Sequence, residues 1–385
     1  MNTNNLQKSG GGRIKFFDTL RGFTMILVVL QHVSIFSFDI NGYETVLNTA
    51  LISFRMPLFF FVSGFFAYRA IEKWTAKLAK DILKRKIQAQ IVCTIVFFAI
   101  FSYCHGSNIF GWINNGFGAY WFTITLFQMF VIYVLLTFIS KATNRHYLLD
   151  IGLIALSIIL FPLCYICSGN IGTVLCWINL EKYFQFFAIG ILARKYQHIF
   201  LAALNNDRFR TSIVISYITF MILMYLNMWD KVSLHSINGI TYRLLQDVFV
   251  RYAGLFTVII FFYSRREYFN QDNKTSRLLC FIGRRTLDIY MLHYFFLPPM
   301  QFMRQYIANS NMLILQLAIG LALTACIIAV CLILSNLLRS SDFLASWLFG
   351  VKPKKTAAQQ AAESAPVIDI SELRTTGATP VTTEK

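Results

Sequence analysis

Apolar runs of membrane-spanning length recur along almost the whole chain, and they restrict the fold more than any other feature of the sequence. Ten segments approach the roughly 17–25 residues that cross a hydrocarbon core. They lie near residues 23–38, 46–68, 87–104, 118–140, 148–166, 173–193, 211–229, 247–263, 286–303 and 312–338. Only 14% of the 385 residues are charged, whereas a soluble domain carries about 25%. We therefore expect an all-α integral membrane protein, built as a bundle of about ten transmembrane helices.

The basic residues behind the formal net charge of +17 are divided unequally between the loops on the two sides of the membrane. With the amino terminus placed in the cytoplasm, most of the 35 Lys and Arg residues fall in inner segments. The outer loops then hold only Lys231, Arg243 and Arg304. An excess of Lys and Arg in cytoplasmic loops sets membrane topology. The pattern predicts two cytoplasmic termini, contact with anionic membrane lipids and no binding to nucleic acid.

The spans divide the chain into one membrane domain and two tails. We place a polar tail at 1–14, the membrane domain at 15–345 and a second cytoplasmic tail at 346–385. This last segment is rich in Ala, Thr, Pro and Glu with few large apolar residues, so we expect it to be disordered.

The longest inner loop, residues 69–86, has apolar side chains at helical spacing between lysines. These side chains are Ile71, Trp74, Leu78 and Ile82. The pattern favours a helix that lies on the cytoplasmic membrane interface.

The stretch DTLRGFTMILVVLQH, residues 18–32, carries charges into an otherwise apolar span. Arg21 and His32 are eleven residues apart, which is three helical turns plus roughly 20°. The two side chains therefore share one helix face, about 16 Å apart along the axis. Arg21 would lie at the mouth of the span and His32 near its centre. This spacing suits a long ligand that is bound at one end and chemically changed at the other.

Ionisable residues inside a span are costly, and each is a functional candidate. Besides His32 they include Arg55, Glu181, Lys182, Asp288 and His293. Helical rise places Arg55 at the depth of His32 on the next, antiparallel span. Each also has a structural interpretation: His32, Asp288 and His293 can hold helices together, and Arg55 can pair with Glu181.

Other polar or small residues have simpler interpretations. Arg251 lies near a predicted outer end and is expected to extend its charge to the interface. The step at Ser63 and Gly64 is typical of close helix packing. Cys164 and Cys167 are the only close cysteine pair, and a redox or metal role competes with packing as small hydrophobes. No disulfide and no metal site is expected.

The chemistry of these side chains points to acyl transfer. A neutral His32 in a dry layer could take a proton from a hydroxyl that attacks an acyl group. Arg21, one turn from Asp18, could bind a phosphate bidentately, and the basic residues Lys84 to Lys86 would add to that anion site. An acyl-coenzyme A has phosphates at one end and a reactive carbonyl on a long arm, as this arrangement requires.

Five stretches of the sequence resemble the membrane acyltransferase 3 family, in the family's own order. FFDTLRGFTMILVVLQH has the Asp-x-x-Arg-Gly opening and the Arg-x10-His spacing. RMPLFFFVSGFF is similar to the second span, YWFTITLF to the fourth, YFQFFAIGILAR to the sixth and IGRRTLDIYMLHYF to the late Tyr-x-x-His stretch. The resemblance covers residues 15–345. It implies a multi-helix membrane enzyme that moves acyl groups, commonly acetyl, onto hydroxyls of cell-envelope sugars.

The resemblance implies roles for individual residues. His32 would be the catalytic residue, and Arg21 would belong to the donor site. Independently of the resemblance, we expect Arg55, at the depth of His32, to stabilise developing charge on the thioester oxygen. The donor-site candidates are Asp18, Arg21, Lys84, Arg85 and Lys86. Candidates for contact with the substrate or for support of the base are Ser63, Tyr120, Trp121, Glu181, Tyr290 and His293. One departure stands out, because the family often has Arg-x-x-Arg before the third span, whereas Gln88 follows Arg85 here.

We therefore predict an O-acyltransferase of the cytoplasmic membrane. It would use acetyl-CoA as a donor substrate, with no permanently bound cofactor, and a glycan or lipid-linked saccharide as acceptor. Some relatives carry a fused hydrolase-like domain that this chain lacks, so a separate extracytoplasmic protein could complete the transfer. The alternative is a polysaccharide exporter on the same fold, since charges at mid-membrane also line transport paths.

Overall fold

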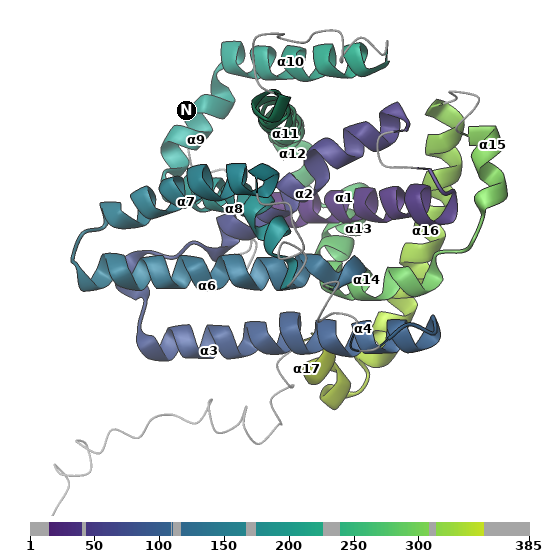
Figure 1. The fold of residues 1–385 in the computed structure, drawn as a ribbon, viewed down its shortest axis with the longest axis horizontal. Helices are drawn as coiled ribbons and strands as arrows, with labels where there is room; N and C mark the ends of the chain where they lie inside the picture. Colours follow the sequence, from purple (N-terminus) through teal and green to yellow (C-terminus); the bar gives the residue numbers. More distant parts are fainter. Residues whose placement is uncertain are drawn as a thin grey trace, which may run out of the picture.

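Figure 1 shows a computed structural model of the chain, in which the elements are helices. The structure describes residues 15–40, 44–108, 110, 117–166, 175–225, 239–307 and 313–349. Within these ranges no strand occurs, which confirms the all-α class. The predicted tail at 1–14 and residues 350–385 of the second tail lie outside the described residues.

The described helices fall into two halves of the chain. The amino-terminal half contains α1 (Lys15–His32), α2 (Val46–Ala67), α3 (Ala76–Lys86), α4 (Cys93–Cys104), α6 (Trp121–Ala142), α7 (Tyr147–Ile166) and α8 (Trp177–Lys195). The second half contains α9 (Gln197–Asn205), α10 (Asp207–Tyr225), α11 (Gly239–Ser264), α12 (Arg266–Asn270), α13 (Lys274–Arg284), α14 (Thr286–Leu292), α15 (Arg304–Ile307), α16 (Leu313–Leu338) and α17 (Asp342–Phe349).

Among the described residues, six helical segments are long and apolar enough to cross a membrane. They are Phe16–Ser37, Val46–Ala67, Ala76–Cys104, Gly118–Ala142, Asp247–Ser264 and Leu313–Leu338. A seventh apolar helix, Tyr147–Leu163, is shorter. The predicted sixth and seventh spans form α8 and α10, which are not among these segments. The chain is thus a helical membrane protein, while the count of ten spans and the side of the termini stay predictions.

The predicted ninth span, residues 286–303, is not one continuous helix. Helix α14 ends at Leu292, a 3₁₀ turn follows over His293–Phe296, and Leu297 is extended. Pro298 and Pro299 come next. Proline has no N–H and disfavours the helical conformation in the residue before it, so the helix cannot continue. The break leaves His293 and Tyr294 at the end of a short helix inside the bundle.

Two pairs of glycines bring helix backbones into direct contact. A Cβ on Gly22 of α1 would lie 2.0 Å from the carbonyl oxygen of Leu279 on α13. A Cβ on Gly283 would lie 2.0 Å from that of Asp18. Helices can approach this closely only where the side chains are absent. Because Arg21 directly precedes Gly22, this contact places Arg21 next to the start of α14.

The second pair joins α2 to α8. A Cβ on Gly64 would lie 2.0 Å from the carbonyl oxygen of Phe187, and one on Gly190 would lie 2.1 Å from that of Phe61. The packing interpretation of the Ser63–Gly64 step is confirmed.

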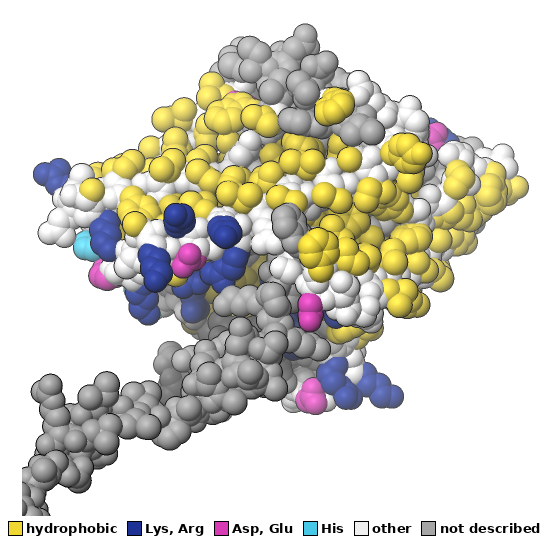
Figure 2. All heavy atoms as spheres, turned by 90° about the horizontal axis from the view of Figure 1, so that it is seen from below, with side chains coloured by type: hydrophobic (Ala, Val, Ile, Leu, Met, Phe, Trp, Pro, Cys, Tyr) yellow, Lys and Arg dark blue, Asp and Glu magenta, His cyan; other side chains and the backbone are white. Residues whose placement is uncertain are grey.

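The loop at 69–86 differs from the predicted interfacial helix. Helix α3 continues through a π-helical stretch, η3 (Ile87–Val92), into α4, so that Ala76–Cys104 is one long helical segment. Ile71, Trp74 and Ile82 are buried in the protein core, not in a lipid surface. Lysines at 73, 77, 80 and 84 are exposed. Figure 2 shows Lys and Arg gathered at one end of a face that is otherwise largely hydrophobic.

Candidate functional site

A cavity of about 420 Å³ lies between α1, α2, α3, α6 and α14. One end, here called the basic end, is lined by Arg21, Arg69, Arg85 and Lys86. The other end, the histidine end, is lined by His32, Arg55, Tyr290 and Tyr294. None of the described residues that line the cavity is acidic. The cavity therefore joins the two residues singled out by their spacing, Arg21 and His32, and favours an anionic ligand.

His32 belongs to a chain of hydrogen bonds that determines its protonation pattern. His293 Nδ1 lies 2.9 Å from the carbonyl oxygen of Ile289, which only accepts, so this nitrogen carries the hydrogen. In a neutral ring, His293 Nε2 is then an acceptor. His32 Nδ1, 2.9 Å away, must donate to it. The Nε2 atom of a neutral His32 is consequently unprotonated and able to act as a base.

Tyr294 occupies the free side of that base. Its hydroxyl lies 3.2 Å from His32 Nε2 and donates to it in this tautomer. Both side chains line the cavity. A substrate hydroxyl that reached His32 would therefore compete with Tyr294 for the same nitrogen.

Helix geometry changes beside two parts of the site. Helix α1 turns into a π-helix, η1 (Val33–Ser37), directly after His32. The second π-helical stretch, η3, begins directly after Lys86 and contains Gln90, which also lines the cavity. Short π-helical segments are frequent at functional sites because they displace side chains from the regular helical positions.

Arg55 comes from α2, two residues before the internal Pro57, and lines the histidine end. Its Nε and Nη1 atoms are buried and have no hydrogen-bond partner among the described residues. Within that part of the chain, no ion pair joins Arg55 to Glu181, so the structural pairing considered from the sequence is wrong. A buried cation without a partner is costly. A negatively charged or polarised ligand would relieve that cost.

The cations of the basic end are held by different contacts. Arg21 Nη2 donates to Thr286 Oγ1 at 3.2 Å. Arg85 Nε donates to the Asp81 carbonyl oxygen at 3.2 Å. Lys86 Nζ lies 4.2 Å from the centre of the Phe130 ring. These contacts orient the side chains while leaving further donors for an anion.

Five of the predicted site residues do not line the cavity: Asp18, Lys84, Tyr120, Glu181 and His293. Asp18 is buried and its carboxylate is 3.8 Å from Arg284 Nε on α13. Lys84 is exposed on α3, and Glu181 is buried in α8. Gln88, at the position of the family's second arginine, donates to the Ser346 carbonyl oxygen at 3.0 Å. Of the Lys84–Lys86 stretch, therefore, only Arg85 and Lys86 reach the cavity.

Aromatic residues of the predicted site tie the start of α6 to α14. Tyr120 donates to the Met291 carbonyl oxygen at 3.2 Å, and Tyr290 donates to that of Ala119 at 2.8 Å. The Phe122 N–H donates to the Tyr290 hydroxyl at 3.3 Å. Tyr290 thus lines the cavity and positions its wall, while Tyr120 supports it from behind.

Ser63 and Trp121 complete the predicted set, and both line the cavity. Trp121 is stacked on Tyr183 of α8, with ring centres 5.5 Å apart. His293 does not line the cavity, since it lies behind His32.

Asp288 forms ion pairs with two arginines. Asp288 Oδ2 and Oδ1 each lie 2.7 Å from the Arg339 guanidinium, and Oδ2 also contacts Ser335 Oγ at 2.5 Å. Arg285 Nη1 is 3.3 Å from the same carboxylate. These contacts link α14 to α16 and favour the structural interpretation of Asp288.

The expected exposure of Arg251 is wrong. Arg251 is 1% exposed, and its Nε lies 2.5 Å from Asp247 Oδ1. Lys182 Nζ is 3.6 Å from the other oxygen of that carboxylate. The error comes from the helix boundary: α11 begins at Gly239, so Arg251 lies near its middle and not near its end.

Cys164 and Cys167 lie outside the side chains that the structure describes. The cysteines that it does describe are free: Cys93, Cys104, Cys176, Cys280, Cys326 and Cys331.

Among the cavity residues with titratable side chains, sequence reasoning missed two, Arg69 and Tyr294. Tyr294 directly follows His293 in the LHYFF stretch and could have been found from that neighbour. Arg69 was counted only as a loop charge, and nothing in its local sequence separates it from the other basic residues of that loop.

This fold and this cavity define a helical membrane protein with an internal base connected to a group of cations. The family model described as an acyltransferase domain, acyltransferase 3, matches residues 14–335. The chain belongs to this family and is a membrane acyltransferase. No curated protein and no solved structure matches the chain.

Proposed function

We propose that the chain is an O-acyltransferase that transfers acetyl from acetyl-CoA to a hydroxyl of an envelope glycan or its lipid-linked precursor. The observation that carries this proposal is the single cavity that connects the unprotonated Nε2 of His32 to the basic end. A base alone fits many reactions. Here the base shares its cavity with several cations, and the described lining contains no carboxylate. Such a cavity fits a substrate that has an anionic end and an electrophilic end.

In the proposed reaction, His32 Nε2 takes the proton of the acceptor hydroxyl while its oxygen attacks the thioester carbonyl carbon. The hydroxyl displaces Tyr294 from that nitrogen. The carbonyl oxygen becomes negatively charged, and the unpartnered Arg55 guanidinium stabilises it. Collapse of this intermediate breaks the carbon–sulfur bond, and the departing thiolate takes the proton from His32. The products are the O-acetyl ester and CoA.

His293 would act behind the base. Its Nε2 accepts the hydrogen bond from His32 Nδ1, and this bond strengthens when His32 is protonated. Its own Nδ1–H is directed to the Ile289 carbonyl oxygen, which holds the acceptor nitrogen toward His32. His293 is thus a positioning residue.

Direction across the membrane follows from the predicted topology. If the basic end faces the cytoplasm, as the distribution of Lys and Arg predicts, acetyl-CoA enters from that side. The acceptor would approach the histidine end from the outer side, and the enzyme would act in the cytoplasmic membrane.

The decisive experiment measures the O-acetyl content of surface glycans by NMR in a deletion strain. The strain is complemented with wild type, with His32→Ala, or with His198→Ala, which changes an exposed histidine of α9. All three proteins must accumulate equally in the membrane. Acetylation restored by wild type and His198→Ala but not by His32→Ala supports the proposal.

Two other outcomes contradict it. Restoration by His32→Ala would remove the base from the mechanism. Glycans that keep their acetyl groups but fail to reach the surface in the deletion strain would favour the exporter.

A further inference from the structure

We propose that Arg69 binds a phosphate group of the CoA donor and that Tyr133 of α6 positions it through the backbone. This inference rests on the donor proposed above. It adds a binding residue that lies outside the basic residues at 84–86, in the connection between α2 and α3.

Arg69 differs from the other cations of the basic end in having an uncommitted head group. Its side chain lines the cavity mouth and is exposed. Among the described residues, no hydrogen bond or ion pair engages its guanidinium, whereas Arg21 and Arg85 each donate to a protein oxygen. All five of its side-chain N–H donors are therefore available to an anion. A planar guanidinium binds phosphate oxygens bidentately.

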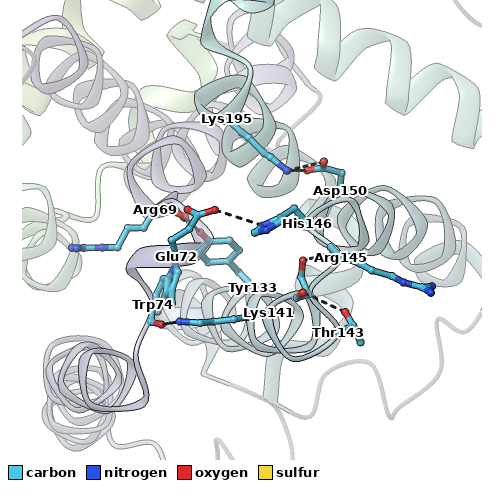
Figure 3. Close-up of polar contacts among 11 residues, drawn as sticks. Arg69, Glu72, Trp74, Tyr133, Lys141, Thr143, Arg145, His146, Asp150 and Lys195 are labelled. Atoms are coloured by element: carbon cyan, nitrogen blue, oxygen red, sulfur yellow. Dashed lines mark hydrogen bonds and ion pairs between the residues drawn. The ribbon is translucent and has the colours of Figure 1, made fainter.

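The backbone of Arg69, by contrast, is firmly held. The Tyr133 hydroxyl accepts from the Arg69 N–H at 3.1 Å and donates to the Arg69 carbonyl oxygen at 3.3 Å. One buried hydroxyl thus satisfies both polar backbone groups of this residue. Figure 3 shows Tyr133 directed toward this segment, with the Arg69 side chain extending away from the surrounding polar contacts.

Contacts with α6 and the connection that follows it also hold the rest of the segment between α2 and α3. Lys141 Nζ donates to the Trp74 carbonyl oxygen. The Trp74 side chain is fully buried against Tyr133 and Phe130, with ring centres 5.9 and 6.3 Å apart. Glu72 reaches His146 at 3.6 Å (Figure 3). A short connection held at several points, with one free arginine directed into a cavity, is what a preorganised anion site requires.

Arg145 provides a matched control. It is an exposed arginine in the connection between α6 and α7, and it does not line the cavity. In Figure 3 its side chain points away from Arg69. Loss of Arg145 removes the same charge from the protein without touching the proposed site.

The first test measures CoA binding to the full chain in nanodiscs for wild type, Arg69→Ala and Arg145→Ala. S-acetyl-pantetheine, which has the thioester arm but no phosphate, is the second probe. We expect Arg69→Ala to weaken CoA binding about tenfold or more, and Arg145→Ala to leave it within twofold. Neither variant should change the binding of S-acetyl-pantetheine.

The outcomes separate the two proposals. If wild type does not bind CoA, the proposed donor is wrong. If wild type binds CoA and Arg69→Ala binds it equally well, or if Arg145→Ala weakens it as much, only the assignment of Arg69 is wrong.

The second test isolates the role of Tyr133. Tyr133→Phe removes the hydroxyl and keeps the ring packed against Trp74. We expect the KM for acetyl-CoA to rise about threefold to fivefold with an unchanged kcat, because chemistry at His32 is unaffected. In an Arg69→Ala background the same change should have no further effect on KM. An equal rise in both backgrounds, or a fall in kcat alone, would mean that Tyr133 acts only on the fold.

Discussion

Arg55 and Arg251 are both arginines inside the helical bundle, but they differ in how their charge is compensated. Arg251 contacts the Asp247 carboxylate at 2.5 Å and lies over the Tyr183 ring. Arg55 lines the cavity, and two of its buried nitrogen atoms have no partner in the described part of the chain. A buried ion pair holds helices together, whereas an unpaired buried cation lowers stability unless a ligand binds it. The difference favours a structural role for Arg251 and supports the catalytic role that we propose for Arg55.

The same distinction applies to the acidic residues and histidines. Asp288 is bound by Arg339, Arg285 and Ser335, and it does not line the cavity. His32 has its base nitrogen directed to the cavity and its other nitrogen bonded to His293. The sequence predicted a similar depth in the membrane for these residues. Their bonding partners, and not their depth, therefore distinguish their roles.

Among the variants that test this comparison, the largest effect is expected for Arg55→Gln. Removal of a donor that stabilises a developing oxyanion costs about 10²- to 10³-fold in kcat. Because Arg55 has no partner to leave unpaired, the melting temperature should stay equal or rise. Steady-state kinetics with acetyl-CoA and thermal unfolding in the same detergent measure both quantities. A wild-type kcat, or a loss of activity fully explained by a lower melting temperature, would mean that Arg55 has only a structural role, like Arg251.

A smaller loss of kcat is expected at His293. In His293→Leu, His32 Nδ1–H loses its acceptor, and a hydrogen bond to a charged group contributes about 1.5–3 kcal/mol. We therefore expect kcat to fall about 10- to 100-fold, with little change in KM. His293→Gln offers an amide oxygen to His32 and an amide N–H to the Ile289 carbonyl, so it should recover part of the loss. If the leucine variant kept full activity, the histidine pair would have only a packing role.

Arg251→Gln should show the opposite pattern to Arg55→Gln. It removes the 2.5 Å contact to Asp247, whose carboxylate also lies 3.6 Å from Lys182 Nζ and whose side chain is 21% exposed. We expect a loss of about 1–3 kcal/mol of stability with kcat within twofold of wild type. The control is Arg277→Gln, which breaks an exposed pair with Asp272 at 3.9 Å and should change stability little. A large fall in kcat in Arg251→Gln without a fall in melting temperature would contradict the comparison.

The helix that carries Arg21 and His32 could be predicted because its geometry is local. Eleven residues on a regular helix place both side chains on one face, and both indeed line the cavity. The partner of His32 could not be predicted in the same way. Its position depends on the break after Leu292 and on how α14 packs against α1, which are long-range features.

The errors at Arg251 and Trp74 have different causes, a helix boundary and the surface that covers a helix. Arg251 was placed near an end because its span was assumed to begin at 247, whereas α11 begins at Gly239. Trp74 was assigned to a lipid-facing helix, although its spacing equally allows burial against α6. Hydrophobic periodicity identifies a face but does not say whether lipid or protein covers it.

Arg21 and Lys84 give the smallest and most selective comparison, because the sequence assigned both to the donor site and only Arg21 lines the cavity. Arg21→Ala removes contacts to a bound anion far from the reacting atoms, so we expect the KM for acetyl-CoA to rise about tenfold while kcat is unchanged. Lys84→Ala removes an exposed charge two residues before Lys86 and should leave KM within twofold. Kinetics at varied acetyl-CoA and at one fixed ionic strength measure both, since salt weakens the contribution of exposed charges most. Equal effects of the two variants would mean that the basic surface attracts the donor as a whole, and that the cavity does not select among its cations.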